Sequence, residues 1–152
     1  MTTEGWSERR VIEIPADTRE AMIAYAREEL PNEACGLLAG RDGRVKRFYP
    51  IANEDRSHLT YRLDGKQQLL AESEMDQKNW EVVGVFHSHT HTEAYPSQTD
   101  RKRAFWPDPE TGMRVYGEAR YVIVSLRDQE PSMRAFWIED AESVTEEELK
   151  IV

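Results

Sequence analysis

Short apolar runs separated by polar stretches dominate the chain and predict a protein rich in β-strands. Each run is short and rich in β-branched or aromatic side chains, as strands are. The runs that predict strands are Val11–Ile14, Cys35–Ala39, Val45–Ile51, Val82–Phe86, Tyr121–Leu126 and Met133–Ile138. Leu59–Leu63 predicts an edge strand, and the tail alternates weakly between polar and apolar residues up to Val152.

Two stretches show helical features instead. Asp17 and Glu20 form a capping-box-like start. The apolar positions that follow at helical spacing, up to Pro31, are Met22, Ala26 and Leu30. Asp64 is expected to cap a second helix over about residues 66–78. Its weak apolar face is formed by Leu69, Leu70, Ser73 and Gln77. Together with an Asp42-Gly43 hairpin turn, these elements predict an α+β fold in which helices flank a mixed sheet.

The composition narrows the class of protein. The 152 residues, without repeats or long linkers, predict a single domain over residues 11–152 after a flexible N-terminus at residues 1–10. A net charge of −9 argues against a nucleic-acid partner. No apolar run approaches the roughly 20 residues that span a bilayer, and the N-terminus lacks the apolar core of a signal peptide. We therefore expect no membrane partner and a cytoplasmic location. The single cysteine, Cys35, excludes an internal disulfide and any zinc site built on several cysteines.

The candidate chemistry gathers in residues 82–100, where a buried strand runs into a polar loop. His87 and His89 continue the strand, and side chains two apart leave the same face, so both imidazoles can reach one ion. Ser97 and Asp100 predict a helix start, with Ser97 as N-cap and Asp100 in the first turn. A return of the chain at this point would bring Asp100 to the two histidines and leave a fourth tetrahedral position for water. Such a site is typical of catalytic zinc and predicts hydrolysis.

Each of these residues also has a simpler interpretation. The two histidines could be polar side chains at a surface, Ser97 could serve only as an N-cap, and Asp100 could serve only the helix dipole. His91 has the same parity as the histidine pair but falls in an expected loop, so we expect it to be exposed to solvent; substrate contact or metal binding is the alternative. Cys35 is expected to be a small core residue, with a redox role as the alternative.

The spacing His-x-His, seven residues, Ser, two residues, Asp resembles the JAMM (MPN-plus) metalloprotease motif, and residues 87–100 fit it without a gap. The family also has an upstream glutamate. Glu33, in Asn-Glu-Ala-Cys-Gly-Leu-Leu-Ala-Gly, stands in the matching context 54 residues before His87. The resemblance implies one Zn²⁺ ion with a bound catalytic water, held by His87, His89 and Asp100. It implies Glu33 as general base and then general acid, and Ser97 as a hydrogen-bond donor to the oxyanion.

The resemblance also implies a fold and a substrate. The fold is the JAMM/MPN architecture, a curved mixed sheet with flanking helices that is similar to cytidine deaminases. Residues 32–40 and 87–100 resemble small bacterial JAMM hydrolases that release cysteine from a ubiquitin-like sulfur-carrier protein. The implied reaction is hydrolysis of the amide bond between the carrier's C-terminal Gly and cysteine, and the implied partner is the carrier's C-terminal tail. Leu59–Leu63 is the candidate edge strand to which that tail would add.

One segment departs from the pattern of these hydrolases. Residues 106–119 are rich in Pro and Gly and predict a long loop. The family usually reaches the next strand sooner, so about residues 108–119 are expected to be an insertion. A variable surface loop is the simpler interpretation. A substrate flap or a contact within a homodimer is the alternative.

Two other functions stay open at this stage. A JAMM isopeptidase that removes ubiquitin-like modifiers, or trims carrier precursors, would use the same residues. A non-catalytic MPN scaffold that binds a ubiquitin-like protein belongs to a different class, and the complete ligand set argues against it. A zinc deaminase is excluded because it needs a Pro-Cys-x-x-Cys segment and this chain has one cysteine.

Overall fold

The computed structural model describes residues 11–152, so the predicted flexible N-terminus at residues 1–10 lies outside the described residues. The elements follow in the order β1 (Val11–Ile14), α2 (Ala16–Glu28), β2 (Cys35–Arg41), β3 (Arg44–Ile51), α3 (Gly65–Gln77), β4 (Glu81–His89), α4 (Gln98–Arg103), β5 (Phe105–Trp106), β6 (Met113–Arg114), β7 (Arg120–Ser125), β8 (Ser132–Asp140) and β9 (Ser143–Ile151). Every strand expected from the sequence is present except Leu59–Leu63.

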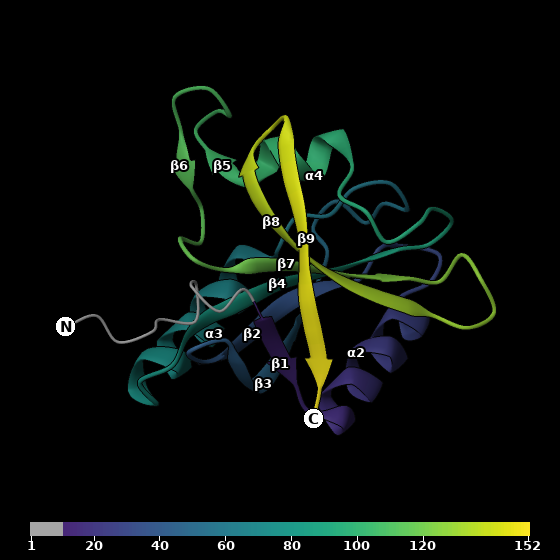
Figure 1. Ribbon diagram of the computed structural model, residues 1–152, viewed down its shortest axis with the longest axis horizontal. Helices are drawn as coiled ribbons and strands as arrows, with labels where there is room; N and C mark the ends of the chain where they lie inside the picture. The colour runs from purple at the N-terminus through teal and green to yellow at the C-terminus, as the bar shows by residue number, and fades with distance from the viewer. Residues whose placement is uncertain (1–10) are drawn as a thin grey trace.

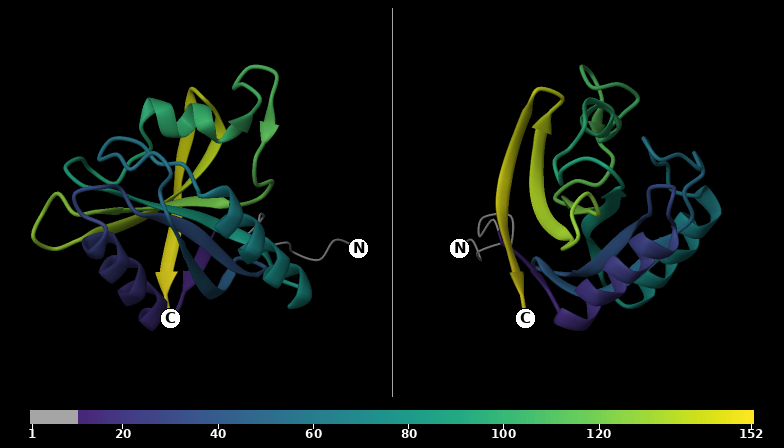
Figure 2. Two further views of the ribbon diagram at one scale, coloured as in Figure 1. Left: turned by 180° about the vertical axis from the view of Figure 1, so that it is seen from behind. Right: turned by 90° about the vertical axis from the view of Figure 1, so that its right-hand side faces the viewer.

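The main sheet curves until it closes on itself, in the order β1-β3-β2-β4-β7-β8-β9 (Figure 1). The strand β1 closes the barrel by pairing in parallel with both β3 and β9. The pair β4–β7 is also parallel, whereas the other neighbours in the barrel are antiparallel. In Figure 2, α2 and α3 lie on one outer side of the molecule and the β8–β9 hairpin lies on the other. This mixed sheet with few helices confirms the predicted α+β fold.

The two faces of the central strands pack into separate clusters. Because side chains alternate along a strand, Phe86 and Val122 join the cluster that contains Met22 of α2, whereas Val85 joins the cluster that contains Met75 of α3. His87 and His89 have the same parity as Val85. The two histidines therefore leave β4 on the same face as the second cluster.

Local signals placed two element ends correctly. Asp42 and Gly43 both adopt positive φ, at 53° and 78°, which is the backbone of the short hairpin turn that joins β2 and β3. The side chain of Asp64 caps α3 by accepting a hydrogen bond from the backbone N–H of Gln67 at 2.9 Å.

Two predictions about the helices were wrong. The helix α2 begins at Ala16 after Pro15, so Asp17 lies in its first turn and no side chain caps it. Proline supplies the start instead, because its fixed φ and missing N–H suit a helix N-terminus. In α3, Leu69 and Leu70 are 68% and 62% exposed. The buried positions are Ala71 and Met75, which are small or flexible enough to pack closely on the sheet.

The predicted edge strand Leu59–Leu63 was also wrong. In the described chain this stretch makes only an isolated bridge between Leu63 and Asn53. Neighbouring side chains accept hydrogen bonds from its backbone. The N–H of Leu59 donates to Ser57 Oγ at 3.0 Å, and the N–H of Arg62 donates to Asn53 Oδ1 at 3.0 Å. Such local hydrogen bonds compete with sheet pairing, so the expected tail-binding edge is absent at this place.

The predicted loop at residues 108–119 contains one short strand. Met113–Arg114 forms β6, which pairs with β5 as a small separate ladder. Asp108 shapes the turn between them by accepting hydrogen bonds from the backbone N–H groups of Glu110 and Thr111, both at 2.9 Å.

Among residues 11–152, none of the helices combines the length and apolar character needed to cross a bilayer.

Candidate metal centre

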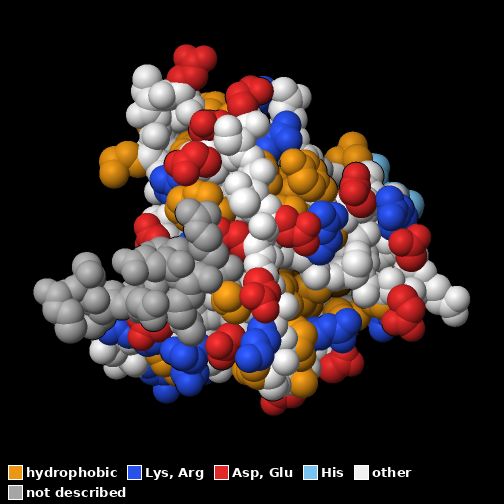
Figure 3. All heavy atoms as spheres, in the orientation of Figure 1, with side chains coloured by type: hydrophobic (Ala, Val, Ile, Leu, Met, Phe, Trp, Pro, Cys, Tyr) orange, Lys and Arg blue, Asp and Glu red, His pale blue; other side chains and the backbone are white. Residues whose placement is uncertain are grey.

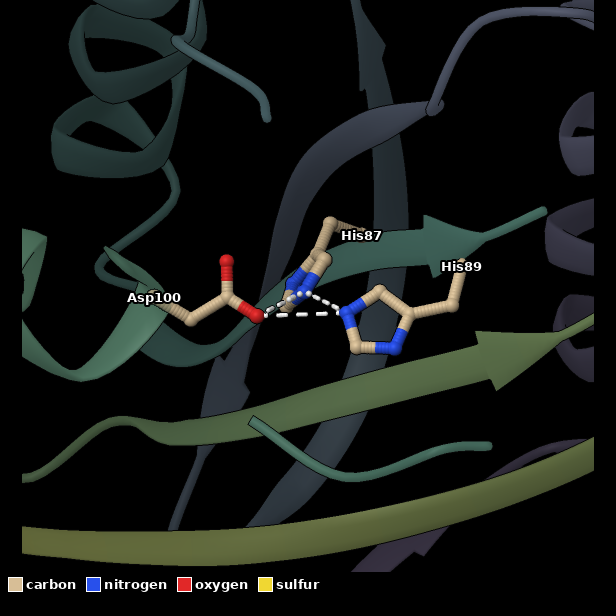
Figure 4. Close-up of side chains that lie close together, drawn as sticks. All are labelled: His87, His89 and Asp100. Carbon is tan, nitrogen blue, oxygen red and sulfur yellow. Dashed lines mark hydrogen bonds and ion pairs between the residues drawn. The ribbon is translucent and has the colours of Figure 1, made fainter. Parts of the chain in front are cut away.

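The histidine pair and the aspartate come from two elements that meet at one end of β4. His87 and His89 are the last residues of β4 on one face, and both are buried. Asp100 is in the first turn of α4, which begins after Ser97. The loop of residues 90–96 reverses the chain, so the helix start returns to the strand end as the sequence predicts. All three side chains converge on one point (Figure 4).

Three ligand atoms form a nearly equilateral triangle. Asp100 Oδ2 lies 3.0 Å from His87 Nε2 and 3.2 Å from His89 Nε2, and the two nitrogens are 3.1 Å apart. Zinc bonds of about 2.0–2.1 Å in a tetrahedral arrangement place neighbouring ligand atoms about 3.3 Å apart. The triangle therefore has the size of one face of a zinc tetrahedron.

The chemistry of the donor set also fits a cation. His89 Nδ1–H donates to the carbonyl of Glu93 at 2.7 Å, which leaves the lone pair of Nε2 directed at Asp100. A carboxylate oxygen and unprotonated imidazole nitrogens at this distance repel one another unless a cation or a proton lies among them. Within residues 11–152 these are the side chains grouped closely enough to share an ion. Zn²⁺ prefers such nitrogen and carboxylate ligands.

Asp100 uses one oxygen for two tasks. Its Oδ2 faces both histidines and also accepts the backbone N–H of Ser97 at 2.9 Å, while Ser97 Oγ accepts the N–H of Asp100 at 3.0 Å. These reciprocal bonds form the capping box of α4. Burial alone would raise the pKa of Asp100, but the two histidines and the Ser97 N–H hold that pKa well below its usual range.

The pKa of each histidine reflects burial, which favours the neutral ring, and Asp100, which favours the charged ring. Burial lowers the pKa of His87, and the neighbouring Asp100 only partly offsets this. Burial also opposes the charged form of His89, but hydrogen bonds to Asp100 and to the Glu93 carbonyl raise its pKa. His87 therefore favours the neutral form that can bind a metal ion.

Glu33 reaches the same place from the segment before β2. Cys35 pairs with His87 in the antiparallel ladder, and Ser88 holds Ala34 through a backbone bond of 3.0 Å and a side-chain bond of 2.8 Å. Continuing this register places Glu33 alongside His89. Its side chain is buried, and its Oε1 has no hydrogen-bond partner among the described residues. Burial raises its pKa to about 8.

The structure also shows the surroundings of the three remaining candidates, Ser97, His91 and Cys35. Ser97 serves as the N-cap of α4, and its hydroxyl hydrogen is not used by the cap. His91 lies beyond the end of β4, is exposed, and is 2.8 Å from Thr90 Oγ1 through its Nδ1. Cys35 is buried, with burial raising its pKa to about 12, and its thiol donates to the Ile51 carbonyl at 3.4 Å. This is the environment of a small core residue.

Sequence patterns did not identify the residues that support the site from the loop between β3 and α3. Tyr61 stacks on His87, with ring centroids 4.4 Å apart and an interplanar angle of 19°. The side-chain amide of Asn53 donates to the carbonyl of Glu33 at 3.1 Å. Arg103 at the end of α4 donates to Asp55 and to the Tyr61 carbonyl, both at 2.7 Å. The polar character of residues 53–58 was the available signal, but it does not specify these contacts.

Comparison with known proteins identifies the family to which the chain belongs. Residues 15–139 match the Prok-JAB model, described as prokaryotic homologues of the JAB domain. The chain is 43% identical over 145 residues to a CysO-cysteine peptidase of Mycobacterium tuberculosis, covering 93% of this chain and 92% of that protein. It is 34% identical over 103 residues to a desampylase of Haloferax volcanii, covering 63% of this chain and 74% of that protein.

A solved structure is similar over the same length. The solution structure of protein DSY2949 from Desulfitobacterium hafniense has a TM-score of 0.77 and 38% identity, and the match covers 93% of this chain and 92% of that chain. The long family match and the high coverage of the peptidase confirm the predicted resemblance. The chain therefore belongs to the Prok-JAB family, the prokaryotic homologues of the JAB domain, and is a hydrolase of the JAMM/MPN type.

Proposed function

We propose that the protein is a zinc-dependent peptidase that cleaves the amide bond between the C-terminal Gly of a ubiquitin-like sulfur-carrier protein and cysteine. The observation that carries this proposal is the buried triangle of His87, His89 and Asp100 with Glu33 in register beside it. The reaction is an amide hydrolysis, so it needs an activated water, a polarised carbonyl and a proton for the departing amine.

His87, His89 and Asp100 would hold the zinc ion. When bound, zinc supplies Lewis acidity that lowers the pKa of a water molecule and polarises the carbonyl oxygen. The Glu93 carbonyl keeps His89 in the tautomer that presents Nε2, and the ring of Tyr61 fixes the plane of His87.

Glu33 would move the proton. Its carboxylate takes a proton from the attacking water and returns it to the amine nitrogen as the C–N bond breaks, so one residue serves as base and then as acid. The free Oε1 is available for this task because the described chain offers it no hydrogen-bond partner. Asn53 and Ser88 both hold the peptide group that joins Glu33 to Ala34, which limits the positions that the Glu33 carboxylate can take.

Ser97 would stabilise the oxyanion. Its Oγ accepts a bond from the backbone N–H of Asp100, so the hydroxyl hydrogen can point at the carbonyl oxygen of the substrate. A single donor of this kind is worth about 2.7–4 kcal/mol at comparable sites.

The substrate assignment is supported by the CysO-cysteine peptidase, which is similar over most of both chains. A second candidate function, removal of a ubiquitin-like modifier from lysine side chains, is supported by the desampylase similarity, which covers a smaller part of this chain. The single cysteine is compatible with a reducing cytoplasm, where we place the reaction.

The test uses two conjugates of one ubiquitin-like carrier protein, one ending in Gly-Gly-cysteine and one joined to a lysine side chain. Mass spectrometry of the released amine after incubation with the purified protein distinguishes the candidates. We expect release of cysteine, loss of release with a chelator, and recovery when zinc is added back. Cleavage of the lysine conjugate alone would favour the second function, and cleavage of neither would contradict both.

A further inference from the structure

A cavity lies beside the candidate metal centre, on the side of the loop at residues 105–116. Its volume is about 510 Å³. Tyr61, Phe105 and Tyr116 form aromatic walls, and Val85 and Tyr121, which pair across β4 and β7, also line it. A space of this size is larger than a single amino acid such as cysteine needs, so the leaving group alone does not account for it.

The cavity opens on the same face of the sheet as the metal centre. Val85 precedes His87 by two residues on β4, which corresponds to about 7 Å along a strand. Tyr61 separates the two spaces, since it lines the cavity and also stacks on His87. A protein whose C-terminal tail enters the metal centre would therefore lie directly over the cavity.

The charges around the cavity contrast with those of the whole chain. Three cations, Arg62, Lys102 and Arg103, line it against one carboxylate, Asp108, whereas the chain carries a net charge of −9. Asp55 pairs with both arginines. The side-chain ammonium of Lys102 is in no ion pair or hydrogen bond among residues 11–152, and the residue is exposed. The cavity therefore offers an acidic partner a cation that is not already paired.

Apolar side chains continue this surface outward. Trp106 and Met113, which pair across β5 and β6, are 73% and 80% exposed, and Val115 is 45% exposed. This hairpin stands out from the barrel (Figures 1 and 2), and hydrophobic side chains project over β6, with acidic side chains nearby, in Figure 3. Exposed apolar groups gathered on a projecting element are typical of protein interaction sites.

The hairpin is held in place before any partner arrives. Tyr116 is hydrogen-bonded to Gln68 and Glu72 of α3. Arg114 binds the carboxylate of Glu139 at 3.0 Å and lies over the ring of Trp137, 4.2 Å from its centroid. A fixed surface loses little conformational entropy on binding, which favours docking of a folded partner.

We propose that the cavity and the exposed face of the hairpin form a docking site for the folded body of the protein substrate. The site would accept an apolar side chain flanked by carboxylates on the surface of that protein. The inference rests on the proposed function, because it assigns the partner to the substrate whose tail is cleaved. It is independent of the residues that carry the chemistry.

Steady-state kinetics on two substrates test the proposal. The first is the intact carrier–cysteine conjugate, and the second is a synthetic peptide of only the last residues of the carrier joined to cysteine. The variants are Lys102→Glu and Trp106→Ala. Lys150→Glu is the matched control, because Lys150 is exposed near the end of β9, which Figure 1 places opposite β5 and β6.

We expect KM for the intact conjugate to rise about fivefold in Lys102→Glu and about tenfold in Trp106→Ala. The kcat for that conjugate, zinc content and hydrolysis of the short peptide should stay at wild-type values, and Lys150→Glu should match the wild type. Added salt should reduce the effect of Lys102→Glu, since the attraction is between exposed charges.

Three results would overturn the proposal, and they can be told apart. An unchanged KM for the conjugate in both variants removes the docking site while leaving the peptidase function intact. An equal loss on the short peptide assigns these residues to the reaction centre or to folding instead. A wild-type protein that cleaves neither substrate contradicts the proposed function itself.

Discussion

At the scale of single residues, Glu33 is distinguished by a buried carboxyl group that the fold does not satisfy. Its Oε1 lacks a partner in the described chain, and burial raises its pKa to about 8. A buried, unpaired acid of this kind costs folding free energy. A residue that serves only the fold would not need this arrangement, whereas a general base beside a water site does.

The first prediction separates metal binding from proton transfer. Glu33→Gln keeps the size of the side chain but removes the base, so we expect bound zinc to be retained and hydrolysis of the carrier conjugate to fall at least about 100-fold. His87→Ala and Asp100→Ala remove ligands, so we expect zinc to be lost together with activity. Metal analysis of each purified variant and the amine-release assay check both statements. Retained hydrolysis in Glu33→Gln would remove Glu33 from the mechanism.

The second prediction concerns the stability of the metal-free protein as pH changes. The folded state raises the pKa of Glu33 from 4.5 to about 8, so the folded state favours the protonated form. Below pH 4.5 the residue is protonated in both states; as pH rises from 4.5 to 8 the unfolded state ionises first, and the free energy of unfolding falls. Glu33→Gln does not titrate, so above pH 8 it should be more stable than the wild type by up to about 5 kcal/mol.

Urea unfolding of both metal-free proteins at several pH values measures this difference. Asp100 acts in the opposite direction, since its lowered pKa gives stability that is lost on acidification, but that loss occurs at a lower pH than the range in which Glu33 ionises. Parallel pH profiles for wild type and Glu33→Gln would show that the Glu33 carboxyl is not held in its neutral form.

At this scale the sequence correctly predicted that His87, His89 and Asp100 converge. The spacing of His87, His89 and Asp100 fixes their relation because a strand and a capped helix start each have a regular geometry. Tyr61 and Asn53 could not be found in this way. Their contacts depend on the path of an irregular loop, which no periodic pattern describes.

At the scale of elements, one ion-pair cluster joins the two halves of the centre. Arg103 ends the helix that carries Asp100, and it holds Asp55 and the Tyr61 carbonyl in the loop opposite. Asp55 also accepts the hydroxyl of Thr60 at 2.8 Å. Arg103 first, and then Thr60, hold the pKa of Asp55 below its usual range. The loop is thereby fastened to α4, and the Tyr61 ring is kept against His87.

The third prediction follows from that cluster. In Arg103→Ala the loop is released, so we expect kcat on the short tail peptide to fall about tenfold while zinc stays bound. Hydrogen exchange of residues 57–63 should become faster in the same variant. Arg127→Ala is the matched control, because Arg127 pairs with Asp128 in an exposed position. Wild-type kcat in Arg103→Ala, with unchanged exchange, would show that the cluster is not needed.

The fourth prediction concerns the attachment of Glu33 to the barrel. Ser88 is buried and its Oγ accepts the backbone N–H of Ala34 at 2.8 Å. In Ser88→Ala that N–H is left without its acceptor, so we expect the free energy of unfolding to fall by about 1–3 kcal/mol. Ser132→Ala, at an exposed strand end, should change it by less than about 0.5 kcal/mol. Urea unfolding of both variants decides this, and equal stabilities would contradict the role given to Ser88.

Element positions were predictable where pattern and local chemistry agree. The strands with buried β-branched runs and the Asp64 cap are examples. Leu59–Leu63 has a strand-like composition, but the side chains of Ser57 and Asn53 take up its backbone N–H groups. The buried face of α3 was predicted wrongly, because Leu69 and Leu70 are large and apolar but are exposed. The small Ala71 packs against the sheet instead.

At the scale of the whole molecule, closure of the sheet could not be foreseen. The parallel pairing of β1 with β9 joins segments about as far apart in sequence as the described chain allows. A buried ion pair stands near this closure: Arg120 of β7 and Glu147 of β9 are 2.6 Å apart, and Arg120 also lies over the Trp137 ring of the intervening β8. Local sequence patterns do not predict a contact between strands that are not neighbours in the sheet.

The fifth prediction tests that pair. Glu147→Ala removes the buried carboxylate that faces the Arg120 guanidinium, so we expect the free energy of unfolding to fall by about 3–5 kcal/mol. Replacing both residues, as in Arg120→Met with Glu147→Leu, should recover most of the loss, because no charge is then left buried. Denaturant unfolding of the two variants measures this. A double variant as unstable as Glu147→Ala would show that shape, rather than charge, dominates at this position.

The shared oxygen of Asp100 constrains how this fold could lose its activity over time. Because Asp100 Oδ2 starts the helix as well as facing the two imidazoles, a descendant released from selection for hydrolysis would still need it. Neither histidine takes part in starting a helix. Inactive descendants of this chain should therefore lose His87 and His89 first and keep Asp100, because the start of α4 still requires it.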